Sequence, residues 1–248
     1  MTQKTLLLTG ASRGIGHATV KVFQAAGWRV LTVSRTAFDA RCPWHAGSTD
    51  HFQGDLSDAS ARQDLVERVR ETLGESGLHA IVNNAGISPK HAGRAQKVWE
   101  MDPDEWRRVV DVNLTGSFNC IRALSPAMVA AGEGWIVNTS SVAGKTFFPI
   151  VASHYAATKS AIIGFTKHIA GELGPHGIRV NALAPGRIAT PMVAGVAPEL
   201  NEAEVARTPL GRLGEPAEVA DTALWLTSPE SSFVTGQTID VAGGLCMT

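Results

Sequence analysis

The stretch Leu6-Leu7-Leu8-Thr9-Gly10-Ala11-Ser12-Arg13-Gly14-Ile15-Gly16 decides the fold. A short apolar run meets a cluster of glycines and continues into a segment with helical periodicity that ends at Gly27. At such a strand-to-helix turn, one glycine permits the tight turn, one lets the backbone approach a phosphate, and one lets the helix pack against the strand. The free N–H groups at the helix start then favour an anion. The stretch therefore predicts a phosphate-binding turn.

Two other motifs compete for these residues. Residues 10–14 match the G-x-S-x-G nucleophile elbow of α/β-hydrolases, but that fold needs an oxyanion donor from an earlier loop, and only nine residues precede Gly10. The elbow also leaves Gly16 unexplained. The P-loop pattern fails because no Gly-Lys-Ser/Thr closes the run. The phosphate-binding turn is the preferred interpretation.

Short apolar runs alternate with longer amphipathic segments along the rest of the chain. This alternation predicts βαβ units, with a parallel sheet covered by helices on both faces. Ligands of such sheets bind outside the carboxyl ends of the strands, so the loops after each strand are informative. We expect strands at 5–9, 29–33, 51–53, 80–83, 135–139, 179–182 and 238–241, and helices at 13–26, 61–73, 104–128 (bent or broken), 153–173 and 217–226.

Composition bounds the class of protein. The chain has 248 residues, 44% of them hydrophobic and 18% charged, which is typical of globular proteins. The 22 basic and 23 acidic residues balance, which argues against nucleic-acid and anionic-membrane partners. The three cysteines are far apart, so we expect a reducing, cytoplasmic setting without disulfides. No histidine pattern predicts a metal site, and no run reaches the ~18 apolar residues of a membrane span.

Residues 9–16 resemble the short-chain dehydrogenase/reductase family, and further motifs extend this resemblance along nearly the whole chain. The matching positions are Asn83-Asn84-Ala85-Gly86, Asn113, Ser141, Tyr155-Ala156-Ala157-Thr158-Lys159 and Pro185-Gly186 with Thr190. Their shared order carries the resemblance, since each motif alone is weak. Among short single-domain members, the chain resembles 3-oxoacyl-thioester reductases and sugar or alcohol dehydrogenases.

The resemblance implies a Rossmann-type, doubly wound parallel sheet of about seven strands, in one NAD(P)-binding domain at 1–248 with a small substrate lid at about 187–212. It also implies a homotetramer and hydride transfer between a nicotinamide cofactor and a small carbonyl or secondary-alcohol substrate. The alternative hypothesis is a non-catalytic Rossmann protein that senses NADP(H). Such proteins typically lose the Tyr/Lys pair, which this chain keeps.

The pair Tyr155 and Lys159 suits acid–base chemistry. Four residues apart on the expected helix, they share a face about 6 Å apart along the axis. Moving a tyrosine pKa from about 10 to near 7 needs roughly 4 kcal/mol. One ammonium at ~5 Å supplies roughly 3 kcal/mol at an effective dielectric of ~20. We therefore expect Tyr155 to act as general acid in reduction and general base in oxidation.

The remaining catalytic candidates are Ser141 and Asn113. Ser141 is expected to hydrogen-bond the substrate oxygen, with Ser140 as a competitor for that role. The resemblance implies that Asn113 holds a water linking the lysine to solvent, and helix bending or capping is the alternative. We expect the substrate pocket to be lined by Ser141, Phe147, Phe148, Val151, His154, Tyr155 and the stretch 188–196.

The residues after the second strand bear on the choice of cofactor. An NAD site usually places an acid about 20 residues past the glycines, but the chain reads Thr32-Val33-Ser34-Arg35, and Asp39 comes too late. Arg13 and Arg35 suit a 2′-phosphate, so we expect NADP(H) over NAD(H). The alternative is that both arginines are solvated. The expected cofactor-binding residues are Gly10, Ser12, Arg13, Gly14, Ile15, Gly16, Ser34, Arg35, Asp55, Leu56, Asn83, Asn84, Ala85, Gly86, Tyr155, Lys159, Pro185, Gly186, Ile188 and Thr190.

Three further positions keep open interpretations. Asp55 either contacts the adenine side of the cofactor or caps the next helix. Residues 192–210 lack clear periodicity and are expected to form a mobile lid. Residues 87–102 are expected to be a solvated loop, with a lip over a polar substrate as the alternative. That loop carries the basic residues Lys90, His91, Arg94 and Lys97.

Overall fold

The computed structural model describes residues 3–36, 50–55, 58–74 and 77–247. Seven parallel strands form one sheet in the order β3-β2-β1-β4-β5-β6-β7, which confirms the predicted doubly wound Rossmann-type sheet. The chain order reverses beside β1, the kind of position at whose strand ends ligands of open α/β sheets bind. The strands are β1 (Thr5–Thr9), β2 (Arg29–Ser34), β3 (His51–Gln53), β4 (Ala80–Asn83), β5 (Gly134–Thr139), β6 (Ile178–Pro185) and β7 (Thr238–Val241).

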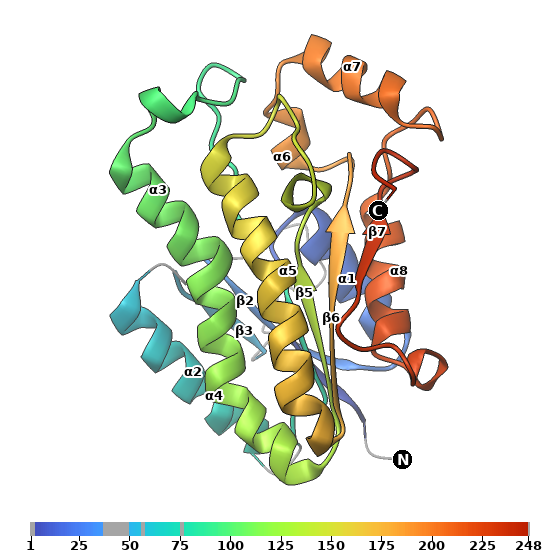
Figure 1. The fold of residues 1–248 in the computed structure, drawn as a ribbon. Helices are drawn as coiled ribbons and strands as arrows, with labels where there is room; N and C mark the ends of the chain where they lie inside the picture. The colour runs from blue at the N-terminus through green and yellow to red at the C-terminus, as the bar shows by residue number, and fades with distance from the viewer. Residues whose placement is uncertain (1–2, 37–49, 56–57, 75–76, 248) are drawn as a thin grey trace.

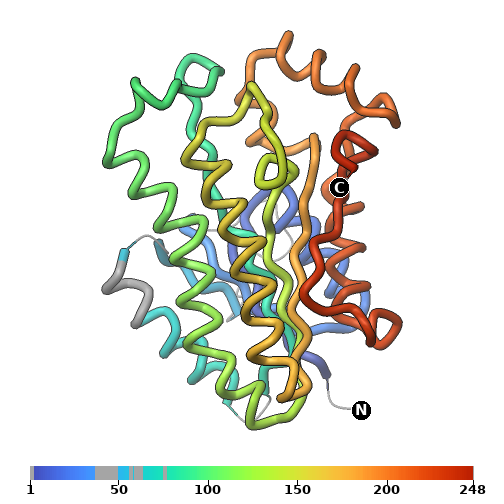
Figure 2. Tube along the Cα trace, in the orientation of Figure 1, coloured from blue at the N-terminus to red at the C-terminus, as the bar shows by residue number. Residues whose placement is uncertain are grey.

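Helices cover both faces of the sheet (Figure 1). The α-helices are α1 (Gly14–Ala25), α2 (Ala59–Leu73), α3 (Pro103–Val110), α4 (Gly116–Ala131), α5 (Ser153–Leu173), α6 (Pro191–Ala194), α7 (Pro198–Arg207) and α8 (Pro216–Leu226). Short helical turns are η2 (Val98–Glu100), η3 (Asp111–Thr115), η4 (Val142–Gly144), η5 (Gly174–His176) and η6 (Pro229–Ser231). In the tube view, α4 and α5 run side by side across the near face of the sheet (Figure 2).

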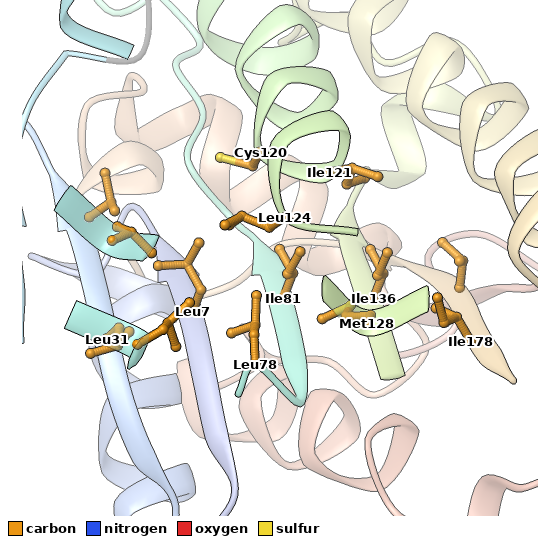
Figure 3. Packing of buried hydrophobic residues seen from close by; sticks show 14 of the residues in the cluster. Leu7, Leu31, Leu78, Ile81, Cys120, Ile121, Leu124, Met128, Ile136 and Ile178 are labelled. Carbon is orange, nitrogen blue, oxygen red and sulfur yellow. The ribbon is translucent and has the colours of Figure 1, made fainter. Parts of the chain in front are cut away.

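The strands are apolar on both faces because helices bury both. In β1, Leu7 faces the cluster formed with α2, α4 and α5, whereas Leu6 and Leu8 face the cluster formed with α1 and α8. Figure 3 shows the first cluster, where Ile81 and Ile136 of the sheet face side chains of α4. Each such buried side chain contributes roughly 1.5–3 kcal/mol, so both layers hold the strand ends in place.

The expected helix at 104–128 is broken, as its sequence predicts. α3 begins after Asp102, whose carboxylate accepts a hydrogen bond from the Asp104 N–H at 2.8 Å. A π-helical turn, η3, then separates α3 from α4. Such turns often occur at functional sites because they redirect one side chain. Here the turn contains Asn113.

Two segments differ from the sequence expectation. β6 runs to Pro185, three residues beyond the predicted strand, because it pairs with β5 on one side and β7 on the other. The stretch expected to lack periodicity forms the short helices α6 and α7, each with a proline at its start. Within the described ranges, we find no helix long and apolar enough to cross a bilayer.

Candidate functional site

A cavity of about 530 Å³ lies at the carboxyl ends of the strands. Its walls come from the loops after β1 to β6 and from α6, toward which the β6 arrow points in Figure 1. Most residues predicted to bind the cofactor line it: Gly10, Ser12, Arg13, Gly14, Ile15, Ser34, Arg35, Asp55, Asn84, Ala85, Gly86, Tyr155, Lys159, Pro185, Gly186, Ile188 and Thr190. The topology therefore gathers these distant segments around one space.

The glycine turn after β1 forms part of the cavity wall. Gly10 and Gly14 have φ values of +74° and +56°, the left-handed region that favours glycine. Gly16 lies behind the turn, where a Cβ would collide with the Gly10 carbonyl oxygen. It therefore allows α1 to begin close against β1, and it is not among the lining residues. The N-terminus of α1 faces the cavity, the geometry that binds phosphate.

The two asparagines after β4 have different places. Asn84 Nδ2 donates to the carbonyl oxygens of Thr9 and Gly10, both at 3.2 Å, which ties this loop to the glycine turn. Asn83 is instead buried in the sheet and donates to Asn138 Oδ1 at 2.9 Å. Asn83 is thus placed as a link between β4 and β5 and not on the cavity wall.

Two exposed guanidinium groups border the outer end of the cavity. Arg13 and Arg35 line it beside Ser34, and Asp55 lines it from the loop after β3. Leu56 and Asp39 lie outside the described residues. Among the described residues of the β2 loop, the side chain at the tip is therefore basic and not acidic.

Another part of the cavity wall brings Tyr155, Lys159 and Ser141 together. α5 begins at Ser153, so Tyr155 lies in its first turn and Lys159 follows one turn later. The Ser141 side chain is close enough to the Tyr155 phenol to lower its pKa. Lys159 Nζ lies 5.6 Å from the centre of the Tyr155 ring and donates to the Thr139 carbonyl oxygen at 2.6 Å.

The structure corrects the predicted electrostatics of this pair. Burial raises the pKa of the Tyr155 phenol, and the Ser141 hydrogen bond and the charge of Arg187 only oppose that rise. Burial also lowers the pKa of the Lys159 ammonium to about 8. Desolvation dominates both groups because each is packed among protein atoms. The phenol is therefore neutral, which is the form that donates a proton.

The neighbouring residues Ser140 and Ser141 have different hydrogen-bond partners. Ser140 is buried, and its hydroxyl donates to the Lys159 carbonyl oxygen at 2.7 Å. Ser141 Oγ accepts from the Ala143 N–H at 3.2 Å, lines the cavity and is the hydroxyl that lowers the pKa of Tyr155. Of the two candidates, Ser141 is therefore the one directed to the phenol.

Asn113 fixes the loop after β4. Its Oδ1 accepts from the Ile87 N–H at 2.8 Å, and its Nδ2 donates to the Ile87 carbonyl at 3.0 Å and to the Thr158 hydroxyl at 3.2 Å. A Cβ built on Gly86 would lie 3.5 Å from both Asn113 Oδ1 and Lys159 Nζ, so these polar atoms flank Gly86. The water-holding role of Asn113 stays a prediction.

The substrate side differs from the sequence expectation at three residues. Val151 lines the cavity, but Phe148 is 4% exposed and packs in an apolar cluster with Val142 and Cys246. Phe147 is 81% exposed. His154 is fully buried, with Nε2 3.1 Å from Glu105 Oε1. The apolar wall comes from Ile150, Val151, Met192, Val193 and Val196.

Two basic residues outside the predicted cofactor and catalytic positions also line the cavity. Lys90 belongs to the 87–102 loop, and its place on the wall fits the alternative of a lip better than a solvated loop. Arg187 begins the expected lid, directly after Pro185-Gly186. Adjacency to two cavity motifs is the signal that points to them. No alternation or spacing rule predicts the direction of a loop side chain, so only the structure shows it.

Comparison with known proteins gives consistent matches. A family model described as enoyl-(acyl carrier protein) reductase matches residues 10–246. Protein FixR of Bradyrhizobium diazoefficiens is 44% identical over 97% of this chain and 86% of its own length. The 3-oxoacyl-[acyl-carrier-protein] reductase FabG of Thermotoga maritima is 39% identical over 98% of this chain and 97% of its own.

Solved structures agree. A 3-oxoacyl-[acyl-carrier protein] reductase from Brucella melitensis is 61% identical, with a TM-score of 0.91 over 100% of this chain and 93% of that one. A second structure from that organism, with bound NAD, is 58% identical, with a TM-score of 0.90 over 100% and 92%. The chain therefore belongs to the short-chain dehydrogenase/reductase family and is an NAD(P)-dependent oxidoreductase.

Proposed function

We propose that the protein interconverts a carbonyl and a secondary alcohol by hydride transfer, with Tyr155 as general acid and base and NADP(H) as the preferred cofactor. The supporting observation is one continuous cavity. It joins the glycine turn at the start of α1 to the Tyr155 phenol and the Ser141 hydroxyl. A phosphate-binding turn and a proton donor on the wall of one space suit a dinucleotide whose reactive ring lies beside a substrate.

The residues present fit a dinucleotide. A Cβ at Gly10 would lie 2.8 Å from the Ala85 Cα, and one at Gly14 would lie 3.2 Å from Thr190 Cγ2, so both glycines keep the cradle open. Ser12, Gly14 and Ile15 would hold the phosphates, while Gly86, Pro185, Gly186, Ile188 and Thr190 would hold the nicotinamide half. When bound there, NADPH would supply a hydride to the carbonyl carbon and leave as NADP⁺.

The chain's own residues handle the proton. In reduction, the Tyr155 O–H bond breaks and its proton goes to the carbonyl oxygen while Ser141 hydrogen-bonds that oxygen. Burial lowers the pKa of Lys159 to about 8, so this ammonium exchanges protons near neutral pH. Asn113, beside the same Gly86, holds the water that returns a proton from solvent.

The preference for NADP(H) is supported by Arg13 and Arg35 at the outer end of the cavity. Guanidinium groups bind a 2′-phosphate through charge-assisted hydrogen bonds. A relative at 58% identity holds NAD, so the ratio of kcat/KM for the two cofactors is the deciding quantity. We expect NADPH to exceed NADH in this chain, and an NADH preference would reject this part of the proposal.

The test of the overall function is loss of NADPH absorbance with a panel of ketones, β-ketoesters and sugars. We expect turnover with at least one carbonyl class, abolished when NADPH is omitted. Tight NADPH binding without turnover on any of them would favour the non-catalytic sensor. The printed names of the relatives make 3-oxoacyl thioesters the first esters to include.

The family resemblance extends this proposal to the assembly. We infer a cytoplasmic homotetramer of single domains, 1–248, in which residues 187–212, including α6 and α7, form the substrate lid. α6 supports the lid role because Met192 and Val193 line the cavity. Light scattering coupled to size exclusion gives the mass in solution, and a monomer mass would reject the assembly.

A further inference from the structure

Two cations line the cavity near Tyr155, and proton and hydride transfer need neither of them. Lys90 comes from the loop after β4, and Arg187 comes from the loop after β6. The charge of Arg187 is close enough to act on the Tyr155 phenol and on Lys90. The three side chains therefore share one region of the cavity wall, although they lie far apart in sequence.

The Arg187 guanidinium is held in place but not fully paired. The backbone of Arg187 is anchored because its carbonyl oxygen accepts a hydrogen bond from the Gly214 N–H at 2.8 Å. Nη2 donates to Asn201 Oδ1 on α7, while Nε is buried without a hydrogen-bond partner among the described residues. Glu204 attracts this cation but is itself bonded to Arg207, 2.9 Å from Oε1 to Nη1. Arg187 lines the cavity, and its guanidinium carries several N–H donors, so donors beyond the one bonded to Asn201 can meet an acceptor there.

Lys90 is half-buried beside this arginine. Its Nζ donates to Ser88 Oγ at 3.0 Å. Burial and the charge of Arg187 hold the pKa of Lys90 down at about 8, against the opposing charge of Glu105. That carboxylate is already shared by His91 at 3.0 Å and His154 at 3.1 Å. Glu105 is thus engaged with both histidines, whereas Glu204 keeps one buried oxygen, Oε2, without a hydrogen-bond partner among the described residues.

The two cation-bearing segments are joined through α7. Arg94, in the Lys90 loop, pairs with Glu199 at 2.7 Å, and the Ala197 N–H donates to the Gly93 carbonyl at 3.2 Å. Asn201, which accepts from Arg187, also donates to the carbonyl of Val193 at 3.0 Å. These contacts fix the two segments that carry Lys90 and Arg187, whose charges act on one another, and a bound anion would relieve that repulsion.

We propose that the substrate carries an anionic group, a carboxylate or a phosphate, next to the carbonyl that is reduced, and that Lys90 and Arg187 bind this group. The inference rests on the proposed function and adds the substrate class to it. Anion binding at these cations places the carbonyl oxygen toward Tyr155 and Ser141. Charge-assisted hydrogen bonds from a guanidinium and an ammonium are the strong ones, so they orient as well as attract.

Matched pairs of charged and neutral substrates test this inference. NADPH-linked reduction is measured for acetoacetate against methyl acetoacetate, and for dihydroxyacetone phosphate against dihydroxyacetone. We expect kcat/KM for the acid of at least one pair to exceed that of its neutral partner about tenfold or more. The pair that shows the preference identifies carboxylate or phosphate.

Variants locate the effect. We expect Lys90→Met and Arg187→Met each to raise KM for the preferred acid about tenfold and to change the neutral partner less than about threefold. Lys97→Met is the matched control, because Lys97 is exposed on the same loop and is not among the cavity-lining residues. A separate readout is thermal stabilisation of the NADPH complex by butanoate but not by butanamide, lost in Arg187→Met.

The outcomes separate the two proposals. Reduction of neutral carbonyls with no preference for either acid, in wild type and variants alike, overturns this inference and leaves the proposed function standing. An equal loss for acid and neutral partner in both variants also overturns it, since that result indicates a structural role. If the protein reduces none of these compounds and none of the wider panel, both the proposed function and this inference are rejected.

Discussion

Opposing influences act on the pKa of the Tyr155 phenol. Burial raises the pKa of its phenol, while the Ser141 hydrogen bond and the Arg187 charge lower it. We expect Tyr155→Phe to reduce kcat by at least about a thousandfold, because Phe has no proton to donate. NADPH affinity, measured by fluorescence titration, should stay nearly unchanged. Turnover within about tenfold of wild type, a barrier change of only ~1.4 kcal/mol, would contradict the role.

Lys159 ties function to stability through its own pKa. Burial lowers that pKa from 10.5 to about 8, so between these values the unfolded chain binds more protons than the folded one. Stability contributed by this residue is therefore lowest below pH 8 and rises with pH. Urea unfolding of the cofactor-free protein at pH 7 and 9.5 should show wild type gaining about 2 kcal/mol relative to Lys159→Met.

Lys167→Met provides the control for this measurement. Lys167 is exposed on the same helix, and we expect its replacement to leave the pH dependence of unfolding as in wild type. A pH profile for Lys159→Met that runs parallel to wild type would show that Lys159 titrates in the folded protein as it does in the unfolded chain.

At the scale of elements, the contact of α1 with β1 depends on a missing side chain. A Cβ at Gly16 would collide with the Gly10 carbonyl oxygen and lie 2.7 Å from Asn84 Nδ2. Because the first of these is backbone, the turn must shift. We expect Gly16→Ala to destabilise the protein by roughly 1–3 kcal/mol and to weaken NADPH binding at least tenfold. Denaturant unfolding and cofactor titration measure the two effects.

Gly171→Ala is the matched change for Gly16→Ala. Gly171 lies within α5 and has open space around its missing Cβ. An alanine there should stabilise the helix by about 0.5–1 kcal/mol and leave the cofactor affinity unchanged. Equal behaviour of the two variants would refute the close-approach role of Gly16.

At the scale of the whole molecule, the sheet order brings the loops after β1 to β6 to one cavity. A ligand that binds only this assembled site stabilises the entire fold by mass action. At a free concentration of about 100 times Kd, NADPH should raise the unfolding free energy by about 2.7 kcal/mol. Thermal unfolding with equal NADPH and NADH should show the larger shift for NADPH.

Arg35→Ala sharpens this comparison. Arg35 lines the cavity from the end of β2 and is exposed. Its replacement should reduce the NADPH shift and leave the NADH shift as it was, because only NADPH carries a 2′-phosphate. Equal shifts for both cofactors in wild type would contradict the NADP(H) preference, and no shift with either would contradict the dinucleotide site.

Local patterns predict most of this fold. The strand at 5–9 and the helix at 153–173 match the structure to the residue, since apolar runs and helical spacing are properties of the chain itself. The break in the helix at 104–128 is also correctly predicted. The misplaced Phe148 and the unplaced Arg187 share one cause. Both lie in a loop that follows a strand. Neither the helical nor the strand repeat of apolar residues applies in a loop, so neither indicates which way a side chain points.

The sequence by itself determined the alternation of strands and helices, the glycine turn and the presence of one tyrosine four residues before a lysine. Tertiary structure alone decided which of two serines meets that tyrosine, that Asn83 is a link within the sheet, and that Lys90 and Arg187 share a cavity wall. The physical reason is that burial and charge proximity are sums over neighbours from distant segments. Those sums raise the pKa of Tyr155 where pairing with Lys159 alone predicts a lower one.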